Sequence, residues 1–408
     1  MNPRAITGFG VASPLGIGRQ AFLEAYARGT SGRRQDGLVE SFDAAPYANP
    51  RIAEVRDFDA TRYLGDKGLR PLDRLAKLLV VASRLALHDA GLKRDGAWVD
   101  DPPDARTGAV APWPDRVGLV VSNAYGSLEA ITELDRVAVL EDARYINPSR
   151  FPLTVSNSAA GYVSIWEDLR AVNVSVSDGN CGALDAVACA DVLLDQERAD
   201  ALLVGGGEAM SEALFLAFHR LGAAGSGPIE DPDGPCIGEG AAIFLLETAR
   251  AAARRSATVL AEVVGYGTSF APPEREGSLV HATPVALEHA IAGALADAGI
   301  APGDIDLVVS GVSGLRVFDE AELLAIGRVL GPDVPVAAPK LVLGETLGAG
   351  GAMAMLAAIA SFRGDPASSH LVRGVRGGAL RPETRVALVT SLGYYGNASA
   401  LVMRKASR

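Results

Sequence analysis

The hydrophobic residues of the chain follow two alternating periods. Short β-branched and aliphatic runs next to glycines predict buried strands. These runs lie at 117–121, 172–176, 201–204, 305–309 and 386–390. Between them, alanine-rich stretches repeat their apolar residues with the 3.6-residue period of a helix. These stretches lie at 72–92, 181–197, 284–299 and 320–330. The alternation predicts an α/β fold whose strands are covered on both faces.

The order of these elements indicates an internal duplication. A helix followed by DIDLVVSG, from residue 304, matches a helix followed by ADALLVGGGEAM, from residue 199. Likewise, AAIFLLE at 241–247 is matched by VALVTSLG at 386–393. No long polar linker interrupts the chain between the two halves. We therefore predict two similar halves, 1–250 and 251–408.

Composition and charge narrow the range of functions. Of the 408 residues, 49% are apolar and 21% are charged, which is typical of a globular protein with a sizeable core. The net charge of −11 and the lack of a basic run argue against nucleic-acid or membrane partners. Three scattered cysteines predict neither a disulfide framework nor a zinc site, and we expect no metal and no cofactor. The N-terminus lacks a signal-peptide profile, so we predict a cytoplasmic location.

Seven motifs occur in a fixed order along nearly the whole chain. They are ITGFGVASPLG (6–16), FPLTVSNSAAGYVSI (151–165), ADALLVGGGEAM (199–210), IGEGAAIFLLE (237–247), AEVVGYG (261–267), PKLVLGETLGAGGA (339–352) and SLGYYGNASALVM (391–403). Together they resemble the β-ketoacyl synthases of the thiolase superfamily. The resemblance implies a five-layer αβαβα thiolase fold built from two pseudo-repeated halves. It also implies dimerisation through a central strand near Asn157 and Ala159.

The resemblance implies a nucleophilic cysteine at the start of a helix, where the thiol pKa is lowered. The family's spacing, counted back from Gly205 and from Asp185, gives Asn180 both times. A carboxamide cannot ionise to a nucleophile or carry an acyl thioester. The neighbouring Cys181 would act only if the turn were shifted by one residue, which rotates a helical side chain by about 100°. We therefore interpret Cys181, like Cys189, as a packing residue.

The resemblance also implies two histidines that stabilise the enolate formed by decarboxylation. This chain has Gly311 at the first position and Glu345 at the second. A carboxylate there would oppose the negative charge of an enolate, at a cost of roughly 4 kcal/mol for about 4 Å and an effective dielectric constant of about 20. The histidines present lie outside the motifs, and we assign them surface or packing roles. They are His88, His219, His281, His289 and His370.

Two further charged residues match positions of the family's motifs. Lys340 keeps the position of the family's supporting lysine, and two interpretations remain open. It is either a functional lysine or one member of a buried ion pair with Glu345 or Asp319. Glu239, which lies between two glycines, is interpreted as holding the geometry of its loop.

The set of replaced and retained residues is itself informative. Asn180, Gly311 and Glu345 replace catalytic side chains, whereas Lys340 and the surrounding motifs remain. This combination resembles the chain length factor, or ketosynthase-β subunit, of type II polyketide synthases, and Glu345 is similar to subunits of polyene systems of the aryl polyene kind. The resemblance implies a heterodimer with an active β-ketoacyl-ACP synthase, in which the chain shapes the tunnel for the acyl or polyketide chain. It also implies contact with acyl carrier protein through that partner.

The segment after SNAYGS (122–127) is expected to enter the dimer interface as a helix. Leu128, Ile131 and Leu134 recur at a spacing of three and would face the partner's tunnel. The alternative is that they are ordinary core residues of an amphipathic helix.

Two other functions remain open at this point. In one, the chain is a standalone acyltransferase in which Glu345 acts as a base and Asn180 helps to form an oxyanion site, or in which Cys181 is acylated. In the other, it is a non-catalytic homodimer that binds an acyl chain or a carrier protein.

Overall fold

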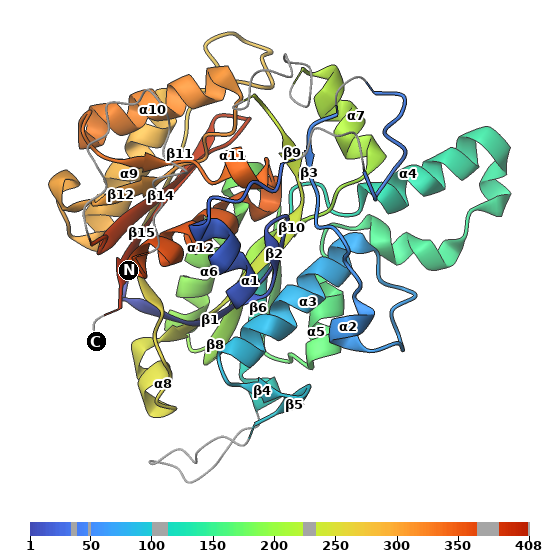
Figure 1. Ribbon diagram of the computed structural model, residues 1–408, viewed down its shortest axis with the longest axis horizontal. Coiled ribbons are helices and arrows are strands. Elements are labelled where there is room, and N and C mark those ends of the chain that lie inside the picture. The colour runs from blue at the N-terminus through green and yellow to red at the C-terminus, as the bar shows by residue number, and fades with distance from the viewer. Residues whose placement is uncertain (34–38, 48–49, 100–112, 223–233, 365–382, 407–408) are drawn as a thin grey trace.

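The computed structural model describes residues 1–33, 39–47, 50–99, 113–222, 234–364 and 383–406. Ten strands of these residues form one continuous path of hydrogen-bonded neighbours, β13-β12-β14-β15-β11-β1-β10-β8-β6-β7 (Figure 1). The first half of the chain supplies β1 (Arg4–Ser13), β6 (Val117–Ser122), β7 (Asn173–Val176), β8 (Ala201–Glu208) and β10 (Gly240–Thr248). The second half supplies β11 (Ala261–Phe270), β12 (Leu307–Val309), β13 (Val336–Ala337), β14 (Val386–Leu392) and β15 (Asn397–Lys405).

The path is symmetric about its middle, as a duplicated fold requires. The halves meet where Arg4–Ile6 of β1 pair with 261–263 of β11. On one side β6 runs parallel to both β7 and β8, and β8 runs antiparallel to β10. On the other side β12 runs parallel to both β13 and β14, and β14 runs antiparallel to β15. Thus β12 corresponds to β6 and β14 to β8. The sequence-based matching, which paired β12 with β8 and β14 with β10, is wrong by one strand because short aliphatic runs resemble one another.

Helices complete five layers around the strands. α3 (Arg74–Asp89) and α5 (Ser158–Glu167) cover the outer face of the first half, and α9 (Pro284–Ala298) and α10 (Arg316–Leu330) cover that of the second (Figure 1). α6 (Gly182–Asp195) and α12 (Gly350–Phe362) lie between the halves in one core that contains residues of both. Leu119 and Val121 of β6 face the α3 layer, whereas Val120 faces the central one, as the alternation of a strand dictates. The predicted αβαβα thiolase fold is confirmed.

α12 is the most enclosed element of the fold. All of its residues are buried, and every one of them is apolar, glycine or Ser361. A helix that is apolar on every side is expected only where it is surrounded by protein.

Most of the predicted elements are present, with shifted ends. α3 begins at Arg74 because the Asp73 carboxylate caps it by accepting a hydrogen bond from the Ala76 amide at 2.8 Å. α6 is preceded by a 3₁₀ turn at Gly179–Cys181. The prediction that 172–176 is a buried strand is wrong in one respect. Within the described part of the chain, β7 has a neighbouring strand on one side, and Asn173 is exposed while the rest of the strand is half-buried.

The predicted interface strand near residues 157–161 is also wrong. Asn157 precedes the first turn of α5, so this segment is helical. Ala159 lies on the inner face of that helix, 4% exposed, within the hydrophobic core around α3. Its side chain is therefore covered by this chain itself, whereas Asn157 is exposed, and the interface role of both residues stays a prediction. The open strand edge of this half belongs to β7.

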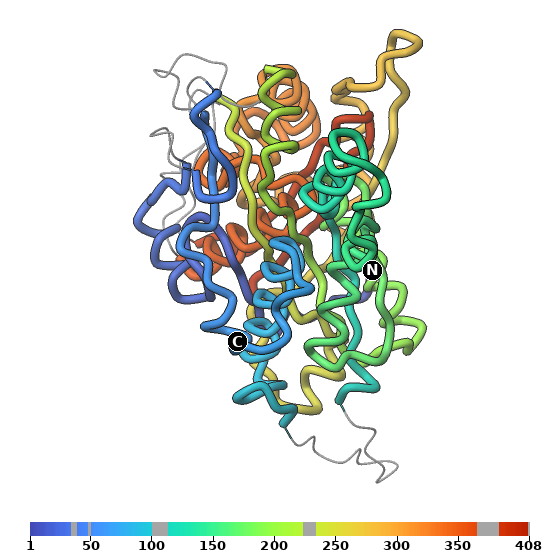
Figure 2. Tube along the Cα trace, turned by 90° about the vertical axis from the view of Figure 1, so that its right-hand side faces the viewer, coloured from blue at the N-terminus to red at the C-terminus, as the bar shows by residue number. Residues whose placement is uncertain are grey.

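An arm projects from the body between β6 and α5. It consists of α4 (Leu128–Val137), a π-helical turn (Ala138–Asp142) and two 3₁₀ segments (Ala143–Tyr145 and Pro148–Thr154). It stands out at the right of Figure 1 and lies toward the viewer in Figure 2. Its exposed apolar side chains include Val139, Leu140, Tyr145 and Phe151. We define this arm as residues 128–154.

The remaining elements are short. The helices are α1 (Arg19–Ala27), α2 (Thr61–Leu64), α7 (Glu212–Arg220), α8 (Ala249–Arg254) and α11 (Lys340–Leu343). The strands are β2 (Gly16–Ile17), β3 (Ile52–Ala53), β4 (Lys93–Arg94), β5 (Ala97–Trp98) and β9 (Ile237–Gly238). Among the described residues, no helix combines the length and the apolar character needed to cross a bilayer. The division of the chain at residue 250, which falls in α8, stays a prediction.

Candidate functional site

Four side chains from distant parts of the sequence meet between the two halves. Asn180 comes from the turn before α6, Lys340 from the first residue of α11, Glu345 from the loop after it, and Tyr394 from the turn between β14 and β15. We call them the Glu345 cluster. Asn180 is 2% exposed, and Lys340 and Glu345 are each 4% exposed. The structure therefore brings together three of the residues singled out in the sequence and adds Tyr394.

The Glu345 carboxylate is the centre of this cluster. Its Oε2 lies 2.8 Å from Nζ of Lys340 and accepts a hydrogen bond from the Tyr394 hydroxyl at 3.1 Å. Its Oε1 accepts from the Leu347 amide at 2.8 Å. Nδ2 of Asn180 lies 3.5 Å from Oε2. A buried carboxylate is tolerated only with such partners, since an unpaired buried charge is costly. Of the two pairings foreseen for Lys340, the structure shows the one with Glu345.

The backbone around Glu345 fixes its position. Its amide donates to the carbonyl of Cys236 at 2.7 Å, and its carbonyl accepts from the amide of Gly238 at 2.8 Å. The preceding Gly344 has φ +77°, and a Cβ there would lie 2.9 Å from Cβ of Ala53. Glycine is thus required before Glu345, both by the backbone conformation and by the close approach.

Asn180 and Cys181 direct their side chains to different places. The Asn180 carboxamide faces Glu345, and its Oδ1 has no hydrogen-bond partner among the described residues. Sγ of Cys181 instead lies 3.5 Å from the carbonyl of Ser391, at the end of β14. Burial, and then the nearby Asp185 and Asp178 carboxylates, raise the pKa of the Cys181 thiol far above its usual range. Such a thiol stays protonated at neutral pH and is a poor nucleophile.

The surroundings of Gly311 are occupied by a carboxylate. Oε1 of Glu322 accepts hydrogen bonds from the Gly311 amide at 2.7 Å and from the Thr390 hydroxyl at 2.6 Å. A Cβ at position 311 would lie 3.0 Å from Oε2 of Glu322. Burial raises the pKa of Glu322. Asp319, the other partner considered for Lys340, accepts instead from the backbone amides of Ser313 and Gly314.

Glu239 has the structural contacts that its place between two glycines indicated. Its fully buried carboxylate accepts from the amides of Val55 and Met210, at 2.8 and 2.9 Å, and forms an ion pair with Arg74. It thereby ties three segments of the chain together.

Sequence reasoning missed Glu208 and the tyrosines. Glu208 ends β8, is 1% exposed, and accepts from the amides of Ala124 at 2.7 Å and Gly348 at 3.3 Å. Burial raises the pKa of this carboxyl to about 7. The available signals were the acidic residue that closes GGGE, and the adjacent tyrosines in SLGYYGN.

The residues predicted to gate a tunnel lie on α4. Leu128 packs against a small core that includes Phe215, Phe218 and Leu347. Ile131 and Leu134 are half-buried, and the only buried residue of α4 is Ala130. Leu128 is therefore in part an ordinary core residue, as the alternative interpretation of this helix predicted. The tunnel role of all three stays a prediction.

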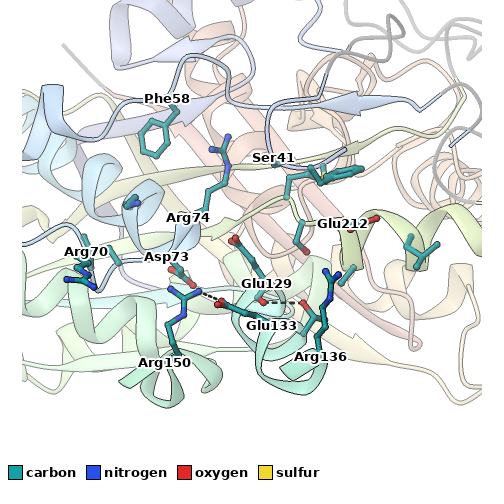
Figure 3. A pocket seen from close by; sticks show the side chains of 18 residues that line it. Ser41, Phe58, Arg70, Asp73, Arg74, Glu129, Glu133, Arg136, Arg150 and Glu212 are labelled. Carbon is teal, nitrogen blue, oxygen red and sulfur yellow. Dashed lines mark hydrogen bonds and ion pairs between the residues drawn. The ribbon is translucent and has the colours of Figure 1, made fainter. Parts of the chain in front are cut away.

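The opposite face of α4 lines an open pocket of about 880 Å³ between α3, α4 and α7. Figure 3 shows Glu129, Glu133 and Arg136 of α4 at this pocket, with Arg150 paired to Glu133. Since neighbouring residues of a helix point about 100° apart, the polar pocket face and the face of Ile131 and Leu134 are separate.

The histidines lie apart from the Glu345 cluster. His88, His219 and His289 lie on α3, α7 and α9, and His281 contacts the carbonyl of Ala271 at 3.0 Å. His370 lies outside the described residues. Within the described part of the chain, no group of His, Cys, Asp and Glu side chains has the arrangement of a metal site.

Comparison with known proteins agrees with this architecture. The N-terminal domain of β-ketoacyl synthases matches residues 1–252, and their C-terminal domain matches residues 260–369. The tetracenomycin polyketide synthase ketoacyl synthase alpha subunit of Streptomyces glaucescens is 33% identical over 378 residues, covering 86% of this chain and 83% of its own. The 3-oxoacyl-[acyl-carrier-protein] synthase 2 of Coxiella burnetii is 29% identical, covering 89% and 86%. The ishigamide ketosynthase/chain length factor structure shares the fold over 100% of both chains, with a TM-score of 0.84 and 24% identity. The chain belongs to the β-ketoacyl synthase family.

Proposed function

We propose that this chain is a catalytically degenerate ketosynthase-like subunit, a chain length factor of type II polyketide biosynthesis. It pairs with an active β-ketoacyl-ACP synthase and shapes the tunnel that holds the growing acyl or polyketide chain. Acyl carrier protein reaches the complex through the partner, and the complex is cytoplasmic.

The observation that carries this proposal is the composition of the Glu345 cluster. At the position assigned to the nucleophile, Asn180 offers a neutral carboxamide next to a carboxylate that is paired with Lys340. Such a site has no thiolate to accept an acyl group, and its donors from Lys340, Tyr394 and Asn180 face the Glu345 carboxylate, whose charge would oppose that of an enolate. The nearest thiol, that of Cys181, is directed to the carbonyl of Ser391.

The contacts of Glu345 weigh against the standalone acyltransferase. A general base needs a free oxygen within hydrogen-bond reach of the proton that it removes. Both oxygens of Glu345 are already engaged, Oε2 by Lys340 and Tyr394 and Oε1 by the Leu347 amide.

Two features of the surface support binding to a partner subunit. Among the described strands, β7 has one edge without a neighbour, and such edges invite pairing with another chain. The arm, residues 128–154, exposes Val139, Leu140 and Phe151, which are 80%, 71% and 66% exposed. Large apolar side chains exposed on a projecting arm are typical of an interaction surface. We assign the edge of β7 and the arm to the contact with the ketosynthase.

Co-expression tests the proposal. The chain would be produced with a ketosynthase from the same gene cluster that keeps its cysteine, purified through a tag on one chain, and weighed by native mass spectrometry. We expect a 1:1 heterodimer whose carrier-bound products require both chains. As a control, the partner with its cysteine changed to alanine should still co-purify but give no product. A stable homodimer that ignores the partner would contradict the proposal and favour the acyl-binding homodimer.

A further inference from the structure

The arm is attached to the body of the protein near its two ends. At the first end, Leu128 packs into the small core beside α7, and Ala130 is buried. At the other end, Leu153 is buried. Residues 131–152 between these ends are all described by the structure, and none of them is buried. The direction in which α4 leaves the body is therefore set by the contacts of its first turn.

Four aromatic side chains fill much of the core against which Leu128 packs. Phe215 of α7 is at their centre and is fully buried. Its ring centroid lies 5.1 Å from that of Tyr47, 5.3 Å from that of Phe42 and 5.6 Å from that of His219. We call these four residues the aromatic cluster. Because packed rings leave little free space, the position of Leu128 depends on the volume that this cluster occupies.

The space behind the rest of α4 is open. The pocket of about 880 Å³ lies there, with charged residues of α4 on one wall and α7, including Ala213, on another (Figure 3). Successive residues of a helix are rotated by about 100°, which places Ile131 and Leu134 on the side of α4 opposite this pocket. A shift of α4 into its own pocket would therefore withdraw these two side chains from the surface that we assign to the partner.

We infer that Phe215 is a positioning residue for the tunnel wall: through the aromatic cluster it holds α4 out of the pocket, and it thereby sets product length without touching the acyl chain. The inference deepens the proposed function and rests on it for the existence of the tunnel. A smaller side chain at position 215 leaves space into which α4 can settle. A larger side chain at position 213 fills the pocket and pushes α4 outward.

The length of the product tests the inference in both directions. In the heterodimer, Phe215→Leu should lengthen the carrier-bound product by one or more two-carbon units, and Ala213→Trp should shorten it. The double variant should return toward the natural length. Phe244→Leu is the matched control, because this phenylalanine is also buried against another ring but lies in the core between the halves. It should leave the length, measured by mass spectrometry, unchanged.

A second readout does not involve the acyl chain. Hydrogen–deuterium exchange of the amides of 128–137 in the full chain should be faster with Phe215→Leu and unchanged with Phe244→Leu. If Phe215→Leu does not accumulate, Ala213→Trp carries the test, because position 213 is half-buried at the pocket wall.

The failure of this inference can be told apart from that of the proposed function. Natural product lengths with Phe215→Leu and with Ala213→Trp, in a complex in which Ile131→Phe does shorten the product, would overturn the inference alone. An unchanged length with Ile131→Phe as well would overturn the tunnel and the inference together. Co-purification with the ketosynthase is measured separately and decides the heterodimer.

Discussion

Lys340 and Glu345 form an ion pair across 2.8 Å in which each side chain is only 5% exposed. Taking two charges out of water is expensive, and the pair is stable only because both charges are present. Removing one partner leaves the other buried and uncompensated. Replacing both by apolar residues removes the ion pair and also the cost of burying its two charges.

Single and double substitutions of this pair should therefore behave differently. We expect Lys340→Met or Glu345→Leu alone to lower the free energy of unfolding by about 3–5 kcal/mol. The free energy of unfolding of the double variant should fall by much less than the sum of the losses in the two single variants. Urea denaturation of the purified chain measures all three, and Glu262→Gln, in a partly exposed pair with Arg404, is a control that should cost less than about 1 kcal/mol. Additive losses would show that the two charges do not depend on each other.

Restoring a thiol at position 180 should not restore condensation. In a complex whose partner carries Cys→Ala at its nucleophile, Asn180→Cys places a thiol beside the Glu345 carboxylate, which disfavours a thiolate. Gly311 still offers no side chain to stabilise the enolate. We expect no malonyl-dependent product above background in a radiolabelled carrier-protein assay. Product formed at more than a few per cent of the natural complex's rate would mean that the rest of the site is intact.

Residues on one face of α4 should set the length of the product. Leu128→Ala and Ile131→Ala would enlarge the tunnel at the interface and lengthen the carrier-bound product by one or more two-carbon units, whereas Ile131→Phe would shorten it. Mass spectrometry of the products made by the heterodimer gives the lengths. Arg136→Ala lies on the pocket face of the same helix and should leave the length unchanged. Identical products from all of the variants would exclude α4 from the tunnel wall.

The pH dependence of stability should reveal Glu208. Burial raises the pKa of this carboxyl from 4.5 to about 7, so between these values the folded chain holds a proton that the unfolded chain releases. The free energy of unfolding therefore falls as the pH rises through this window, by about 3 kcal/mol at most for this one group. Glu208→Gln, which is neutral at every pH, should flatten this slope. Urea titrations at pH 5, 6, 7 and 8 test it, and an unchanged slope in the variant would mean that Glu208 ionises normally.

Features that depend on residues close together in the sequence could be predicted, whereas contacts between residues far apart in the sequence could not. The helix that follows residue 127 was predicted from local spacing, and Glu345, five residues from Lys340, was one of the two partners considered for it. Asn180, singled out by the spacing of the motifs, lies in the same site. Tyr394 contacts Glu345 although 49 positions separate them in the sequence, and no local sequence pattern predicts that contact.

The errors have different origins. Strand order within each half is set by which edges pair in three dimensions, so two aliphatic runs of similar composition could not be told apart. The strand near residue 157 was implied by the family resemblance, and the apolar residues of 158–167 alone suit either a strand or a helix. Packing against α3 favours the helix and buries Ala159.

The enclosed position of α12 has a consequence for how the protein is made. The first half of the chain leaves the ribosome before residues 350–362 exist, yet its central layer is completed by them. Until then, the inner face of its strands has α1 and α6 to cover it, and part of its apolar surface stays in water. The first half therefore cannot reach its final packing during its own synthesis. The whole molecule is therefore completed late in translation, and co-expressed but separate halves should assemble through α12 and through the pairing of β1 with β11.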